Sequence, residues 1–182
     1  MEIVTQHEYI LFHLYYKCSE RGIALRTFSM LKGLPVYTNR GECIGTVNDI
    51  CLSDIGKIEG IMVHRKAIVK KRRFVSLNDV HSFGPEGIVL KQWEDSQHGY
   101  KPKVHYHLFH ADCLFGKMLF SRAGEELGML QDVYFLENLG TIVAYETTDG
   151  FFSELTEGTR LIKSKQPPVL GKDAILISVY DQ

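Results

Sequence analysis

The sequence predicts an all-β protein that consists of two tandem copies of one small β-barrel, with little helix. Three observations support this prediction. The stretch 41–50 recurs as 124–133 with Gly, Glu, Gly and Asp at matching positions. The apolar segments between the turns have the lengths of strands, and neither copy contains a convincing apolar period of 3.6 residues. Internal similarity of this kind indicates a duplicated unit, and about 65 residues per copy suits a small closed β domain.

The repeated motif sets the expected positions of turns and strands. Its structural residues are Gly41, Gly45 and Asp49 in the first copy and Gly124, Gly128 and Asp132 in the second. The leading glycine supplies the positive φ of a tight turn, and the second glycine, inside a strand, indicates a bend or a close backbone approach. An aspartate repeated after such a turn indicates a local hydrogen bond to the backbone more than general acid–base chemistry.

The strand that starts near Cys43 has two mixed faces. Simple alternation places Ile44 and Ile50 on one face and Cys43, Asp49 and Cys51 on the other. Because neither face is cleanly polar, the strand suits a curled barrel better than an open sheet. We expect Cys43 and Cys51 to be small buried apolar side chains.

Four segments follow from the repeat. They are an N-terminal extension at 1–26, a first barrel at 27–92, a linker rich in Pro, Gly and His at 93–111, and a second barrel at 112–182. The extension has no counterpart in the repeat. One hypothesis is that it is not made natively, because a leucine codon at Leu25 can serve as a bacterial start; intact mass of the native gene product tests it.

Several short motifs carry a resemblance to a known family. They are 32–36 (Lys-Gly-Leu-Pro-Val), 41–49, 72–80 (from Arg-Arg-Phe-Val-Ser-Leu to Asp-Val) and 88–90 (Ile-Val-Leu). This pattern resembles the PRC-barrel domain, the small β-barrel of the photosynthetic reaction centre H subunit and of the ribosome maturation factor. The resemblance covers 27–91 well and 112–179 more weakly, and is closest to bacterial tandem PRC-barrel proteins. It implies a docking module with no shared catalytic residue.

Composition indicates a soluble cytoplasmic protein. The net charge is −1, and the four cysteines form no C-x-x-C pair, which favours reduced thiols. No apolar stretch approaches the roughly 20 residues that a membrane-spanning helix requires. No P-loop or dinucleotide-binding glycine motif is present, and we expect no cofactor.

A basic run is the strongest local feature of the first copy. Its cationic residues, the candidates for binding an anion or partner, are Arg65, Lys66, Lys70, Lys71, Arg72 and Arg73. Clustered Lys and Arg form an electrostatic footprint for phosphates or anionic lipid headgroups, and so support an RNA- or ribosome-associated factor as an alternative function. The preferred interpretation is a solvated hairpin tip whose charges discourage edge pairing.

The two copies differ in charge. Residues 29–91 carry 10 Lys or Arg and 6 Asp or Glu, whereas residues 112–182 carry 6 and 11. The resulting balances, +4 and −5, favour attraction between unlike copies, within one chain or head-to-tail in a homo-oligomer.

A histidine-rich segment raises a weaker alternative, a ligand- or metal-binding protein. Its candidate ligands are His105, His107, His110 and Cys113. Imidazole suits zinc or nickel, but the spacing matches no established zinc site, and chance clustering in a linker is the preferred interpretation.

These features favour a non-enzymatic cytoplasmic adaptor that docks on another protein or assembly through its barrels. No nucleophile, base and oxyanion-stabilising set converges anywhere in the chain. The RNA- or ribosome-associated role is the first alternative, and the metal or ligand role is the second.

Overall fold

Strands dominate the structure, a computed structural model that describes residues 24–65, 72–93, 106–110, 113–149 and 159–179. Within these ranges the helical segments are one turn of α-helix, α2 (Phe28–Leu31), and one 3-10 turn, η1 (Leu77–Asp79). The all-β prediction with little helix is therefore confirmed. The same ranges contain no helix long and apolar enough to cross a membrane.

The first repeat forms one sheet from six strands of its own. They are β2 (Pro35–Tyr37), β3 (Cys43–Leu52), β4 (Ile58–His64), β5 (Arg72–Ser76), β6 (Val80–Phe83) and β7 (Ile88–Leu90). Their order in the sheet is β5-β4-β3-β2-β7-β6. All neighbours are antiparallel except β2 and β7, which run parallel.

The second repeat forms a second sheet with the same topology. Its own strands are β9 (Met118–Ser121), β10 (Glu126–Leu136), β11 (Ile142–Thr148), β12 (Arg160–Lys163), β13 (Val169–Leu170) and β14 (Ala174–Ile177). The order β12-β11-β10-β9-β14-β13 repeats that of the first sheet, including one parallel pair, β9 with β14. The duplication inferred from the sequence is thus a duplication of fold.

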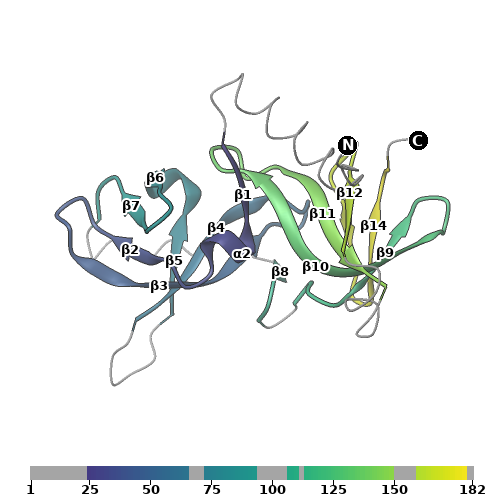
Figure 1. Cartoon of the computed structure of the whole chain (residues 1–182), viewed down its shortest axis with the longest axis horizontal. Helices are drawn as coiled ribbons and strands as arrows, with labels where there is room; N and C mark the ends of the chain where they lie inside the picture. Colours follow the sequence, from purple (N-terminus) through teal and green to yellow (C-terminus); the bar gives the residue numbers. More distant parts are fainter. Residues whose placement is uncertain (1–23, 66–71, 94–105, 111–112, 150–158, 180–182) are drawn as a thin grey trace, which may run out of the picture.

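The strand pairing does not close either sheet into a ring. Among the described residues, no ladder joins β5 to β6 or β12 to β13, the strands at the ends of the two sheets. The two sheets lie side by side along the long axis of the molecule, with β3 and β10 as their longest strands (Figure 1). Each predicted barrel is therefore, within the described residues, a sheet whose two end strands do not pair with each other, and six of its strands come from its own repeat.

Each sheet gains a seventh strand from the segment that precedes the other repeat. β1 (Leu25–Thr27) comes before the first repeat but pairs with β10 of the second. β8 (Tyr106–His107) comes before the second repeat but pairs with β3 of the first. Figure 1 shows both short strands between the two sheets. The sequence did not predict this reciprocal exchange, because both strands fall in segments interpreted as an extension and a linker.

The larger of two hydrophobic clusters in the described residues runs through both repeats; the smaller one consists of Tyr134, Ala144 and Leu161. The larger cluster joins buried side chains of the first sheet, such as Ile50 and Ile61, to those of the second, such as Leu130 and Val133. Phe28, from α2, and Leu108, which follows β8, belong to the same cluster. Because these side chains share one core, neither repeat buries its apolar surface alone.

A backbone contact between the turns of the two repeats reinforces this union. The amide of Ile58, at the start of β4, donates to the carbonyl of Gly140 at 2.8 Å. Gly140 has φ of 66°, and a Cβ there would collide with the carbonyl oxygen of Ile58. Only glycine therefore allows the two backbones to approach at this point.

The simple alternation expected along β3 is wrong. Two register shifts, between Val47 and Asp49 and between Cys51 and Leu52, break the period of two. As a result Asp49 is buried beside Ile50. Cys43 is exposed rather than buried, and a further register shift, in the pairing of β3 with β2, lies between Cys43 and Gly45.

Candidate docking surface and the junction of the repeats

Asp49 anchors the second repeat's leading segment onto the first repeat. Its carboxylate is 0% exposed and accepts hydrogen bonds from the amides of Leu108, Phe109 and His110, at 3.1–3.2 Å. His110 Nδ1 also lies 2.5 Å from Asp49 Oδ2. An ionised carboxylate can only accept, so the imidazole donates from Nδ1. One buried side chain thus holds three successive residues.

Asp132 makes the matching anchor in the opposite direction. Its two carboxylate oxygens accept from the amides of Phe28 at 3.0 Å and Ser29 at 2.9 Å. These two amides open α2, and the Thr27 hydroxyl caps the same turn by accepting from the Met30 amide. Asp132 is 4% exposed, and so it too is committed to the backbone.

Both aspartates also make the local hydrogen bond expected from the sequence. Asp49 Oδ1 accepts from the amide of Ile50 at 2.9 Å, and Asp132 Oδ1 accepts from that of Val133 at 2.7 Å. The sequence did not predict the hydrogen bonds that these aspartates make to the segment preceding the other repeat. The repeated aspartate was their signal in the sequence, but nothing in the pattern indicated that its other partners lie in the segment preceding the other copy.

The motif glycines occupy the conformations that require glycine. Gly41 and Gly124 have φ of 81° and 88°. Gly45 and Gly128 lie within strands, and a Cβ on Gly128 would come 2.9 Å from the Thr148 carbonyl oxygen. A Cβ on Gly45 would likewise come 2.4 Å from the carbonyl oxygen of His64. These residues shape the sheets and contact no candidate site.

The basic run lies at the connection between β4 and β5. Arg65, just after β4, and Arg72, the first residue of β5, are exposed. Arg73 is half-buried and is in register with Val63. Lys66, Lys70 and Lys71 lie outside the described residues. The structure therefore places only part of the predicted anion-binding set.

The histidine candidates come close to Asp49 rather than forming a separate site. His107 Nδ1 lies 3.6 Å from both Asp49 Oδ2 and Cys51 Sγ. His107 also forms an isolated bridge with Cys113. His105 lies outside the described residues. In the part of the chain that is described, no group of three or more His, Cys, Asp or Glu side chains is placed to hold a metal ion.

The cysteines differ in their surroundings. Cys51 is fully buried, and burial, followed by the nearby charge of Asp49, raises the pKa of its thiol to about 12. A thiol with this pKa is not a nucleophile near neutral pH. Cys43, in contrast, is exposed, and its thiol donates to the carbonyl of Gly45.

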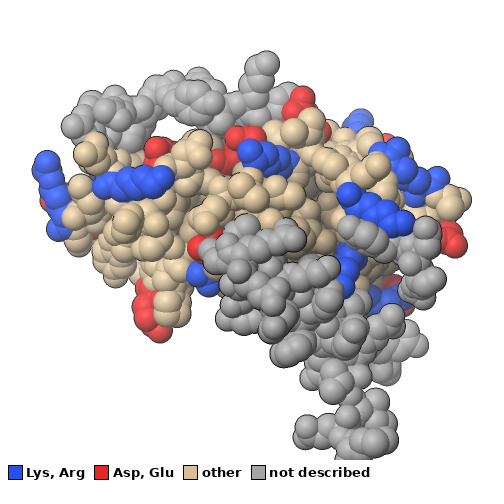
Figure 2. Space-filling model, turned by 90° about the horizontal axis from the view of Figure 1, so that it is seen from above, with Lys and Arg blue, Asp and Glu red and all other residues tan. Residues whose placement is uncertain are grey.

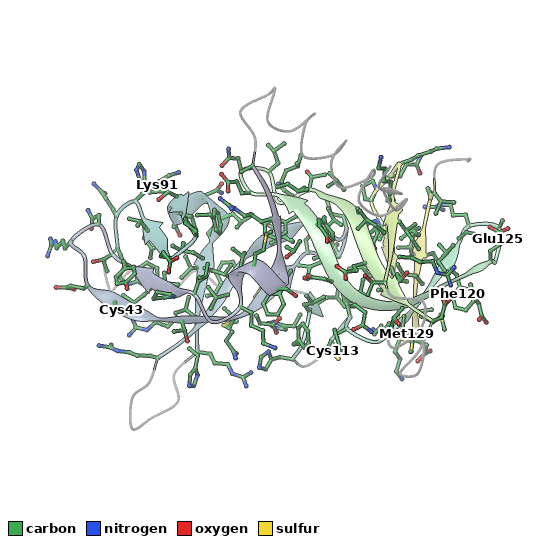
Figure 3. All side chains as sticks on the ribbon, viewed as in Figure 1. Cys43, Lys91, Cys113, Phe120, Glu125 and Met129 are labelled. Carbon is green, nitrogen blue, oxygen red and sulfur yellow. The ribbon has the colours of Figure 1, made fainter. Side chains whose placement is uncertain are left out.

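The outer face of the second sheet carries an apolar row across three strands. Val169 of β13 is in register with Leu176 of β14, which is in register with Phe120 of β9. Val169 is 47% exposed, Leu176 is 39% exposed and Phe120 is half-buried. Figure 3 labels Phe120 in the right-hand sheet. The intervening side chains point inward, because Leu119, Leu170 and Ile175 are buried.

The described charges do not divide the face drawn in Figure 2 into a basic half and an acidic half. On the face drawn in Figure 2, Lys and Arg side chains occur at both ends of the molecule, with Asp and Glu among them. The opposite net charges of the two repeats therefore do not form two single-sign surfaces on this face.

Comparison with known proteins gives two findings. The profile of the PRC-barrel domain matches residues 26–94, which include the six strands β2 to β7 of the first repeat. The chain is also 34% identical over 157 residues to the uncharacterized protein YrrD of Bacillus subtilis (strain 168), covering 85% of this chain and 88% of the relative. A match of that length must include residues of both repeats.

Proposed function

Because the chain belongs to the PRC-barrel family, we propose that it is a non-enzymatic docking protein that binds another protein or assembly through its barrel surfaces. Neither the family's description nor the relative's name is that of an enzyme. We place this role in the cytoplasm, because the described cysteines Cys43, Cys51 and Cys113 are free thiols and a reducing compartment suits them.

The apolar row on the outer face of the second sheet carries this proposal. Scattered exposed apolar side chains are ordinary, but Val169, Leu176 and Phe120 are cross-strand neighbours. A contiguous apolar strip on the outside of a sheet is typical of a surface that another molecule covers. Docking through this strip would leave the core undisturbed.

The positions of the reactive side chains also favour a non-enzymatic role. Asp49 and Asp132 are buried and hold backbone amides. Cys51 is a buried thiol with a raised pKa. These side chains serve the fold and are not free for acid–base or nucleophilic work.

Affinity capture with matched variants tests the docking role. The tagged full chain is used to recover proteins from native lysate at low and high salt, with and without nuclease, and the recovered partner is then purified and titrated. We expect a protein to be recovered that survives nuclease. Leu176→Glu should weaken its binding by about tenfold or more, because interface centres tolerate charge poorly. Leu139→Glu, at another exposed leucine, is the matched control.

An RNA- or ribosome-associated role is the second candidate. The exposed guanidinium groups of Arg65 and Arg72 at the base of the β4–β5 connection favour it. The same capture distinguishes the two, because recovery that is lost with nuclease and at high salt indicates phosphate contacts. Recovery of nothing above a tag-only control contradicts both roles.

Head-to-tail self-association is a further proposal within the docking role. The balances of +4 for residues 29–91 and −5 for residues 112–182 support it. Sedimentation at low and high salt is the measurement. A mass of one chain at every concentration in low salt contradicts self-association, whereas an assembly that dissociates with salt supports it.

A further inference from the structure

An exposed lysine lies against a group of aromatic rings where the two leading segments meet. Lys32 Nζ lies 4.7 Å from the centroid of the Phe109 ring and 6.0 Å from that of Phe28. The Phe109 ring also stacks on Phe115, with centroids 4.3 Å apart and planes inclined by 28°. Phe28 and Lys32 lie between β1 and β2, and Phe109 and Phe115 lie between β8 and β9.

Packing of the core does not account for the whole group. Phe28 is 1% exposed and belongs to the core, but Phe115 is 37% exposed and Lys32 is also exposed. A phenylalanine kept at the surface beside a lysine leaves apolar area and positive charge in contact with water. Aromatic side chains are enriched at protein–protein interfaces, and Phe115 keeps part of its ring at the surface beside the positive charge of Lys32.

Lys32 has no carboxylate partner in the described part of the chain. No described Asp or Glu oxygen lies within 4 Å of its ammonium group, as the observed ion pairs involve Arg26, Arg160 and histidines. The two acids of the junction, Asp49 and Asp132, are buried and bonded to amides. Contact with ring faces is worth about 1 kcal/mol at an exposed site, so an incoming carboxylate can still pair with Lys32.

The junction holds this group in place before any partner arrives. Asp132 fixes the first turn of α2, which ends one residue before Lys32. Asp49 accepts from the Phe109 amide, and the Phe115 amide donates to the Leu108 carbonyl at 2.9 Å. Side chains that are already ordered lose little entropy on binding.

We propose that Lys32, Phe109 and Phe115 form a docking site for a short acidic segment of a partner protein. The segment brings a carboxylate to Lys32 and an apolar side chain to the exposed part of Phe115. This inference rests on the proposed docking function and adds a second contact, separate from the apolar row around Leu176. Charge complementarity is the reason for an acidic partner.

A peptide segment fits this site better than single-stranded nucleic acid. Proteins that bind single strands stack successive bases on several accessible rings along a basic groove. Here Phe28 is buried and Phe109 is half-buried against Phe115 and Lys32, so Phe115 is the most exposed ring of the group. One exposed ring and one lysine suit one apolar and one acidic side chain.

Titration of the full chain with short capped peptides tests the proposal by nuclear magnetic resonance. The probes are Gly-Asp-Phe-Asp-Gly, Gly-Lys-Phe-Lys-Gly, Gly-Asp-Ser-Asp-Gly and an oligouridine. We expect saturable shifts with the first peptide, centred on the signals of Lys32, Phe109 and Phe115. The lysine and serine peptides should bind at least about fivefold more weakly, because each lacks one of the two contacts.

Reversing the charge of Lys32 distinguishes a role in peptide recognition from a role in folding. Lys32→Glu should turn the preference toward the lysine peptide, an outcome that a merely structural lysine would not produce. Lys57→Gln, at another exposed lysine of the first repeat, should change nothing. Equal binding of acidic and basic peptides, tighter binding of oligouridine, or no saturable shift with the acidic peptide overturns the proposal.

Failure of the Lys32 site and failure of the proposed docking function give different results. If the full chain recovers a protein partner but Lys32→Glu and Phe115→Ser leave its affinity unchanged, docking stands and this site is wrong. If the acidic peptide binds at Lys32 but no partner is recovered from lysate, the site stands and the docking role lacks support.

Discussion

Asp49 Oδ2 lies 2.5 Å from His110 Nδ1, although one residue lies in a strand of the first repeat and the other in the segment leading to the second. The amides of residues 108–110 converge on the same carboxylate. Asp132 does the same for the segment that leads to the first repeat. The two anchors are therefore reciprocal. An aspartate of each repeat binds the segment that precedes the strands of the other repeat.

Removal of the Asp49 carboxylate should destabilise the protein strongly. Asp49→Ala leaves several amides without an acceptor, and we expect a loss of at least about 3 kcal/mol in the free energy of unfolding. Asp49→Asn keeps one acceptor oxygen and should cost less. Urea unfolding followed by the fluorescence of Trp93, the one tryptophan of the chain, measures both.

The control for this experiment is Asp54, an exposed acid in the next turn. Asp54→Ala should change the free energy of unfolding by no more than about 0.5 kcal/mol. Amide hydrogen exchange at Leu108 and Phe109 should also accelerate in Asp49→Ala. Unchanged exchange at these amides would contradict the anchor.

Gly140→Ala should be much more costly than Gly116→Ala. Both glycines have positive φ, 66° and 76°, but only at Gly140 would a Cβ meet backbone, that of Ile58 in the other repeat. We expect about 1 kcal/mol for the backbone conformation alone at Gly116 and at least about 3 kcal/mol at Gly140. Equal urea midpoints for Gly140→Ala and Gly116→Ala would show that the Ile58 and Gly140 backbones are not in close contact in solution.

Replacement of the basic run should not remove a protein partner. In the variant Lys70→Gln, Lys71→Gln, Arg72→Gln and Arg73→Gln, we expect the recovered partner and its affinity to remain, because docking is proposed to use other surfaces. A phosphate-bearing partner would behave differently. Its binding would weaken, and the slope of log K against log salt would flatten by about one unit for each lost contact. Lys163→Gln with Lys165→Gln in the second repeat is the comparison.

The repeated motif predicted the fold well because its residues act locally. The turn at Gly41 and the close approach at Gly45 depend on neighbours in the same repeat, and periodicity reports those. The crossing of β1 and β8 could not be predicted in the same way. Both strands are two or three residues long, and their partners lie more than fifty positions away, at Leu136 and Cys51.

The docking site around Lys32 was harder to predict from the sequence than the fold. Lys32 was used as part of the family motif, Phe109 fell in the predicted linker at 93–111, and Phe115 fell in the predicted second barrel at 112–182. No spacing rule joins them, because they meet only through the two anchors. Cys43 shows the opposite error, since a buried side chain was predicted and the structure exposes it, next to a register shift between β2 and β3.

Cys51 should make the protein less stable as pH rises above about 9. Burial raises the pKa of the folded thiol from the ordinary value of 9.0 to about 12. Below pH 9 both folded and unfolded chains keep the proton, so Cys51 adds no pH dependence there. Between these values the unfolded chain releases the proton and the folded chain retains it. The free energy of unfolding should therefore fall by about 1 kcal/mol per pH unit.

Urea unfolding of the parent and of Cys51→Ala between pH 7 and 10 isolates this contribution. The alanine variant differs in packing at every pH, so the informative quantity is the difference between the two slopes above pH 9, not the absolute stability. Titration of lysines and tyrosines affects both proteins alike and cancels in that difference. A thiol reagent gives an independent check, because exposed Cys43 should react rapidly in the folded protein while Cys51 reacts only on unfolding. Parallel pH profiles, or rapid modification of Cys51 in the folded protein, would mean that its thiol is not held in the buried setting beside Asp49.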